Sequence, residues 1–154
     1  MHDELHAHTD DAIQHLDRLI QLEYDTMAAY RAAMERVDNT ASRGELELFF
    51  EDHDETARAL ASCITRYGGE AHHGDLERAW TNGGKLVGRA SGDAAVLGVL
   101  ADLEGKVRRV YETAQEQLRQ VADPPLASVL AAALAEDEQH RKWLVQAIES
   151  PPPG

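Results

Sequence analysis

Aromatic residues make up only 5% of the 154 residues, and cysteine occurs once, at Cys63. So few aromatic residues, beside abundant Ala, Leu, Glu, Gln and Arg, argue against β-sheets and favour helices. A single cysteine excludes an intramolecular disulfide, and its apolar neighbours predict a small core residue without chemistry. The sequence therefore predicts an all-α protein.

Long apolar runs and positive charge are also scarce. The longest nearly apolar run, 126–135, is about half of the roughly 20 residues that cross a bilayer, and the N-terminus lacks the pattern of a secretory signal. The chain has 15 Lys and Arg against 28 Asp and Glu, a formal net charge of −13. Such a charge repels nucleic acid and anionic membranes and attracts cations. We expect a cytoplasmic protein that binds neither nucleic acid nor membrane.

Four segments carry apolar residues at steps of three, four and seven, which draw one stripe along a helix. Thr9 is the expected N-cap of the first helix, and Ser42 with Glu45 forms a capping box for the second. Asp93 and Asp123 are the expected caps of the last two helices. The predicted helices span about 10–38, 42–67, 94–121 and 124–149.

The connections between these segments predict the topology. The short break after residue 38 makes the first two helices antiparallel, and Gly68-Gly69 ends the second. The chain from Gly68 to Gly92 is richer in Gly and polar residues and has one weakly amphipathic stretch. We therefore expect a long crossover with one short helix, in which His72-His73 makes at most adventitious metal contacts. Two antiparallel hairpins joined in this way form a four-helix bundle, one domain over 1–150 with a Pro-rich tail, 151–154.

Each apolar stripe is interrupted near mid-helix by polar residues. These are Glu23 in the first helix, His53 in the second, Glu104 in the third, and Asp137 with His140 in the fourth. Burying unpaired carboxylates of like sign costs several kcal/mol, and no Lys or Arg lies on the stripes. A positive charge is therefore expected between the carboxylates, from a metal ion or from a protonated histidine, unless a carboxyl stays neutral.

The interruptions also repeat along the chain. Glu23 is followed seven residues later by Tyr30, and Glu104 seven residues later by Tyr111. A duplicated hairpin that closes with an approximate two-fold brings the polar residues to one level of the core. We expect the tyrosines to pack and to hydrogen-bond the carboxylates. The set of carboxylates and histidines suits iron, manganese or zinc.

These residues lie in segments that resemble the ferritin-like superfamily. The segments are Leu19-Ile20-Gln21-Leu22-Glu23-Tyr24, Phe50-Glu51-Asp52-His53, Leu103-Glu104-Gly105 and Glu138-Gln139-His140. From about Leu16 to Ile148 the chain is similar to a bacterial family of small ferritin-like proteins of unknown function. In the superfamily, two helices each give a Glu and two each give Glu-x-x-His to a pair of iron or manganese ions. The resemblance implies a ferritin-like four-helix bundle.

Most of the superfamily's ligand positions are matched. Glu23 and Glu104 correspond to the helices with a single Glu, and Asp137-x-x-His140 corresponds to one Glu-x-x-His. The second helix departs, because Phe50 stands three residues before His53. Five ligands remain for a mono- or dinuclear site where the full site has six, unless Glu51 or Asp52 turns inward.

Two functional hypotheses follow. The first is a ferritin-like metal-binding protein that holds iron or manganese in metal homeostasis or the oxidative-stress response. As an enzyme, it would be a ferroxidase- or peroxidase-like oxidoreductase acting on O₂ or peroxide, and a homodimer is a possible assembly. The alternative is a metal-free helical interaction module with a degenerate site, whose polar core fixes the register of the helices.

Overall fold

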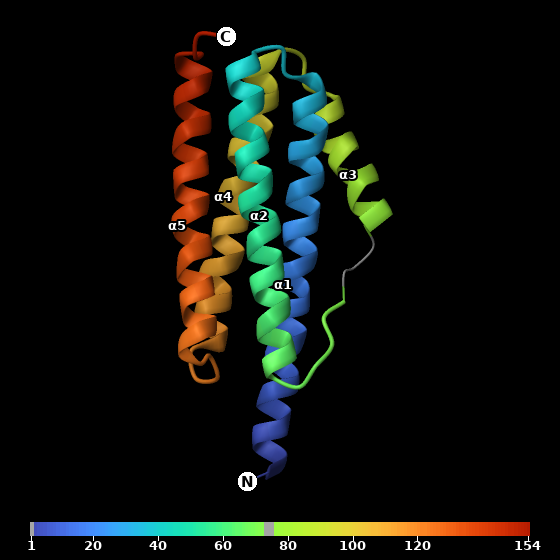
Figure 1. The fold of residues 1–154 in the computed structure, drawn as a ribbon, viewed down its shortest axis with the longest axis vertical. Coiled ribbons are helices and arrows are strands. Elements are labelled where there is room, and N and C mark those ends of the chain that lie inside the picture. The colour runs from blue at the N-terminus through green and yellow to red at the C-terminus, as the bar shows by residue number, and fades with distance from the viewer. Residues whose placement is uncertain (1, 73–75) are drawn as a thin grey trace.

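The computed structural model describes residues 2–72 and 76–154, so His73 of the His72-His73 pair lies outside the described residues. Four long helices run side by side as a bundle, and one short helix lies along the outside of the first (Figure 1). The described residues contain no strand, and the predicted all-α bundle with its short crossover helix is confirmed. The helices are α1 (His2–Arg36), α2 (Thr40–Arg66), α3 (Leu76–Gly88), α4 (Asp93–Leu118) and α5 (Pro124–Glu149).

The capping residues predicted for three helices are wrong. α1 already begins at His2, because residues 2–9 contain no Pro or Gly to end the helix, and so Thr9 is not its cap. Asn39, rather than Ser42, caps α2: its side chain accepts a hydrogen bond from the Ser42 N–H at 2.9 Å. α4 is preceded by Gly92, with φ of 88°, and Asp93 is its first residue.

The Asp93 carboxylate explains the start of α2. It accepts hydrogen bonds from the backbone N–H groups of Asp38 at 2.9 Å and Asn39 at 3.0 Å. This contact fixes the turn between α1 and α2 against the start of α4. Asn39 is thereby held in the position from which its side chain caps the helix, and Ser42 becomes a buried residue of the first turn.

The start of α5 and the end of α2 follow the predictions. The Asp123 side chain accepts from the Leu126 N–H at 3.0 Å, with Pro124 as the first residue of α5. At the end of α2, Gly68 has φ of 86°, a conformation that favours glycine, and the Gly69 N–H donates to the Ile64 carbonyl at 3.0 Å.

The crossover helix α3 packs closely against α1. A Cβ on Gly83 would lie 2.5 Å from the Ala28 carbonyl carbon, so only glycine permits this approach. The Arg31 guanidinium lies over the Trp80 ring, 5.2 Å from its centroid, which is a cation–π contact. Trp80 therefore packs against α1 through Arg31.

The apolar core is divided into two clusters. One includes Leu16, Leu60 and Leu130, together with the buried free Cys63, and the other includes Leu46 and Leu100. The polar residues predicted to interrupt the stripes belong to neither cluster. Among the described residues, no helix combines the length and the apolar content needed to cross a membrane.

Candidate metal centre

Four helices bring the predicted polar side chains to one place inside the bundle. α1 contributes Glu23, α2 His53, α4 Glu104, and α5 both Asp137 and His140. None of the five is more than 3% exposed. No Lys or Arg is found among the buried residues of the described chain, so the carboxylates have no guanidinium or ammonium partner here. The spatial convergence inferred from the sequence is therefore present.

His53 lies between two carboxylates. Its Nδ1 is 2.6 Å from Glu23 Oε2, and its Nε2 is 2.6 Å from Glu104 Oε1. A neutral imidazole has one N–H and can donate to only one of these oxygens, whereas the imidazolium donates to both. Burial lowers the pKa of His53, but the charges of Glu23 and Glu104 outweigh this effect and raise it well above its ordinary value. A protonated His53 thus offsets one of the two negative charges of the glutamates.

The two tyrosines exchange partners across the approximate two-fold. The Tyr30 hydroxyl donates to Glu104 Oε1 at 2.7 Å, and the Tyr111 hydroxyl donates to Glu23 Oε1 at 2.6 Å. Each repeat therefore supplies the hydrogen bond to the glutamate of the other repeat. Burial, together with the neighbouring glutamate, raises the pKa of each tyrosine, so both remain donors.

Glu104 is the centre of the cluster. Besides the bonds from His53 and Tyr30, its Oε1 lies 3.4 Å from Nδ1 of His140. Burial raises the pKa of Glu104, but the two histidines outweigh burial and hold it below its usual range. Its second oxygen, Oε2, is also buried and accepts no hydrogen bond from these three side chains. A buried, ionised carboxylate is a position at which a cation would be stabilised.

Asp137 completes an inner group of four side chains, which are His53, Glu104, Asp137 and His140. Burial, reinforced by the charge of Glu104, raises the pKa of Asp137 to about 9, so this carboxyl holds a proton near neutral pH. A hydrogen bond between the two carboxyl groups raises this pKa further, so the protonated Asp137 donates to Glu104. One ligand atom from each of His53, Glu104, Asp137 and His140 lies within 4.8 Å of all the others.

This inner group fits a divalent metal ion. Metal–ligand bonds of about 2.0–2.2 Å place two ligands at most about 4.4 Å apart, so the observed spread of 4.8 Å needs only a small contraction. Two imidazoles and two carboxylates suit iron, manganese or zinc. The buried oxygens of Glu104 and Asp137 are the acceptors that an ion would engage once the Asp137 proton is released.

Both histidines are backed by a carboxylate outside this group. His53 is held by Glu23 at Nδ1, and His140 is held by Asp52 Oδ2 at Nε2, 2.9 Å away. Carboxylates in this position orient metal-binding imidazoles and fix the tautomer. Glu23, which the sequence predicts as a ligand, thus contacts the inner group through His53.

Two features of α2 were missed or left open by the sequence. Asp52 turns towards the core and contacts His140, while Glu51 stays exposed. The Phe49 ring stacks on the His140 imidazole, with 4.1 Å between the ring centroids, a contact that no motif in the sequence indicates. Phe50, three residues before His53, is half-buried against the Leu46 cluster and supplies no ligand.

The fold and these buried residues define a ferritin-like four-helix bundle with a polar centre. A solved structure titled "Crystal structure of ferritin like, diiron-carboxylate proteins from Bacillus anthracis str. Ames" is similar to this chain, with a TM-score of 0.75 and 19% identity. The similarity covers 92% of this chain and 97% of that chain. Residues 11–117 match the family described as Domain of unknown function (DUF2383), and the chain belongs to this family. No curated protein matches the chain.

Proposed function

We propose that this protein binds one divalent metal ion, iron or manganese, with His53, Glu104, Asp137 and His140 as ligands. The observation that carries the proposal is the arrangement of the two histidines. Each directs one ring nitrogen towards Glu104, and each has its other nitrogen held by an outer carboxylate. The two adjacent buried carboxyls of Glu104 and Asp137, which share a proton in the absence of metal, support the same assignment.

Protons occupy the positions where the ion would bind. His53 carries an additional proton and Asp137 is neutral, so metal binding releases protons from both groups. When bound, such an ion supplies Lewis acidity and, for iron or manganese, one-electron chemistry. Tyr30 donates a hydrogen bond to Glu104, and Tyr111 fixes Glu23, which in turn orients His53.

The setting that we propose is metal homeostasis or the oxidative-stress response in the cytoplasm, with O₂ or peroxide as the small substrate if the centre is redox-active. The similar solved protein is described as a diiron-carboxylate protein. In this chain Phe50 occupies the position of one carboxylate of a complete diiron set. A single ion is therefore the expected occupancy, and zinc remains compatible with the ligands. Glu23 would join the ligands only in a dinuclear form.

Elemental analysis of protein purified without a histidine tag tests the proposal directly. We expect about one equivalent of iron or manganese, or one equivalent taken up on anaerobic titration of the metal-free protein. His140→Ala should weaken binding at least tenfold, in line with the loss of a buried ligand. His72→Ala, which removes an exposed histidine, is the matched control. Absence of uptake by the wild type, with a melting temperature that excess chelator leaves unchanged, would overturn the proposal.

A metal-free interaction module is the second candidate, and the His53 bridge favours it. The imidazolium satisfies Glu23 and Glu104 without any metal, and Phe50 removes one ligand. On this interpretation the polar layer fixes the register of the helices. The same elemental analysis and chelator experiment separates the two candidates.

A further inference from the structure

The contact between α2 and α5 differs on the two sides of the buried polar residues His53 and His140. Aromatic side chains cover one side, and a groove lies on the other. On the first side the Phe49 ring stacks on His140 and meets Trp143 edge-on, with centroids 5.6 Å apart. Phe49 and Trp143 therefore place apolar rings beside His140 at that end. On the other side, towards the end of α2, small and polar side chains replace the aromatic ones.

The groove on this second side measures about 490 Å³. Its lining includes Ala59 and Ala132, which are small, together with Thr56, Glu55 and Glu136, which supply oxygen atoms. No Lys or Arg lines this groove. Its surface therefore attracts cations and leaves room for one to enter.

Two carboxylates connect the groove with the buried cluster. Glu136 is half-buried, and its Oε2 lies 3.3 Å from the Thr56 hydroxyl. That hydroxyl is also 3.1 Å from the Asp52 carbonyl, and its single proton cannot serve both oxygens. The Asp52 side chain is 40% exposed, yet its Oδ2 contacts the buried Nε2 of His140. Glu136, Thr56 and Asp52 thus place oxygen atoms between the groove and His140.

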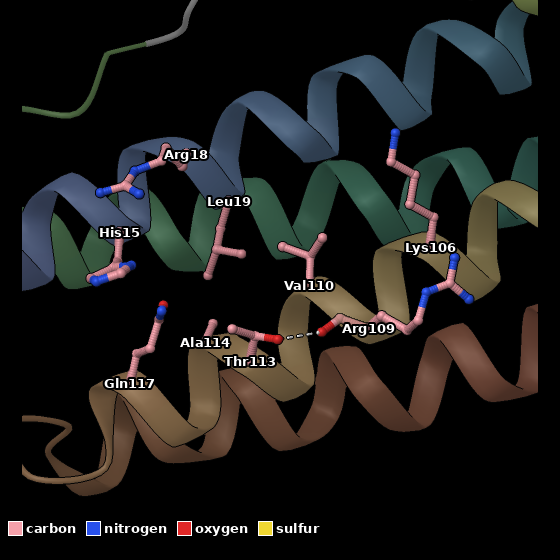
Figure 2. Close-up of a pocket in the computed structure, with 9 residues that line it drawn as sticks. All are labelled: His15, Arg18, Leu19, Lys106, Arg109, Val110, Thr113, Ala114 and Gln117. Carbon is pink, nitrogen blue, oxygen red and sulfur yellow. Dashed lines mark hydrogen bonds between the residues drawn. The ribbon is translucent and has the colours of Figure 1, made fainter.

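The groove between α1 and α4 has the opposite character. It measures about 300 Å³ and is lined by Arg18, Lys106 and Arg109 around Leu19 and Val110 (Figure 2). No carboxylate lines it. A divalent cation is repelled there, so the electrostatic field favours approach from the side of α2 and α5.

We propose that the groove between α2 and α5 is the entry path for the divalent cation, with Glu136 and then Asp52 as successive carboxylate contacts before the buried ligands. The inference rests on the proposed metal-binding function. The buried carboxyls of Glu104 and Asp137 supply the acceptors beyond His140, within the group of four proposed ligands. Asp52 contacts Nε2 of His140, and the other nitrogen of that ring, Nδ1, faces Glu104.

The first test compares Glu136→Gln with Glu138→Gln. Both variants remove one negative charge from α5, but Glu138 lies on the groove between α4 and α5 instead. Stopped-flow mixing of the metal-free protein with Co²⁺ gives the association rate, and titration gives the stoichiometry. We expect Glu136→Gln to slow association about tenfold, with unchanged stoichiometry, and Glu138→Gln to bind at the wild-type rate.

A second pair of variants tests the space in the groove without changing its charge. Ala132→Trp fills the space between Ala59 and Glu136, whereas the exposed Ala131, which does not line the groove, becomes Trp in the control. We expect slow Co²⁺ uptake only in Ala132→Trp. Wild-type rates in both Glu136→Gln and Ala132→Trp would overturn the entry path while leaving the metal centre in place. A wild type that binds no Co²⁺, Mn²⁺ or iron(II) would instead overturn the proposed function itself.

Discussion

The two helical hairpins present their histidines in different ways. In the hairpin α1–α2, His53 is fixed by two contacts of 2.6 Å to buried glutamates. In the hairpin α4–α5, His140 lies 3.4 Å from Glu104 and contacts the partly exposed Asp52. The two copies of the hairpin have therefore diverged. His53 offsets negative charge in the core, whereas His140 connects the core with the surface.

The largest expected effect comes from removing these histidines one at a time. His53→Ala leaves two buried glutamates without a counter-charge, and we expect it to destabilise the metal-free protein by about 3–5 kcal/mol. His140→Ala should cost less, about 1–3 kcal/mol, because its contacts are longer or partly exposed. Urea unfolding of the two metal-free variants measures the difference. The double variant Glu23→Gln/His53→Ala should recover part of the stability that His53→Ala loses. Equal losses of stability in His53→Ala and His140→Ala would contradict the difference between the two hairpins.

The pH dependence of stability tests the same charge balance. The pKa of His53 is raised above 6.5 and that of Asp137 is raised from 3.8 to about 9. The folded chain therefore keeps protons that the unfolded chain releases, and its stability falls as pH rises by about 1.4 kcal/mol per pH unit for each such proton. The lowered pKa of Glu104 acts oppositely: its contribution is present above about 4.5 and is lost in acid.

We accordingly expect the metal-free protein to be more stable at about pH 6 than at about pH 9, as measured by urea unfolding at several pH values. Asp137→Asn should reduce the slope, because the amide does not titrate. Bound metal should weaken the decline, since it replaces the protons. A stability that rises steadily from pH 6 to pH 9 in the metal-free wild type would show that protons on His53 and Asp137 do not stabilise the core.

The missing carboxylate of α2 can be restored. Phe50→Glu places a carboxylate one turn before His53 on the same helix face and completes a second Glu-x-x-His. We expect the metal-free variant to lose about 2–4 kcal/mol, because an aromatic contact is lost and an anion is added. Anaerobic titration with iron(II) should rise from about one to about two equivalents. Phe50→Gln is the neutral control, and a wild type that already binds two ions would show that Asp52 supplies the carboxylate.

The convergence of Glu23, His53 and Glu104 could be predicted because each interrupts an apolar stripe. A helix stripe has one burial environment, so a polar residue within it must share the core with those of the facing helices. The seven-residue spacing also predicted that Tyr30 and Tyr111 bond the carboxylates. The exchange of partners between the repeats depends on how the two hairpins face each other, which the spacing does not specify.

Two other features depend on contacts between distant segments. Asp52 is next to His53 in the sequence and has the pattern of a solvated residue, but the packing of α2 against α5 brings it to His140. Asn39 and Ser42 are both good capping residues. Asp93, more than fifty residues away, decides between them by binding the backbone of Asn39.

The smallest expected effects concern the tyrosines, and they test how far the two-fold extends. Tyr111→Phe removes the hydroxyl that bonds Glu23 Oε1, which accepts no other described hydrogen bond, and should cost about 1–2 kcal/mol. Tyr30→Phe should cost less, about 0.5–1 kcal/mol, because Glu104 Oε1 still accepts from His53. Urea unfolding of the metal-free variants resolves such a difference. Tyr67→Phe is the control for losing a tyrosine hydroxyl away from the polar centre, since that hydroxyl contacts the Asp123 N–H at 3.4 Å and the Asp123 side chain at the bundle end. A larger loss in Tyr30→Phe than in Tyr111→Phe would mean that His53 is bound mainly to Glu23, and that Glu104 relies on its tyrosine.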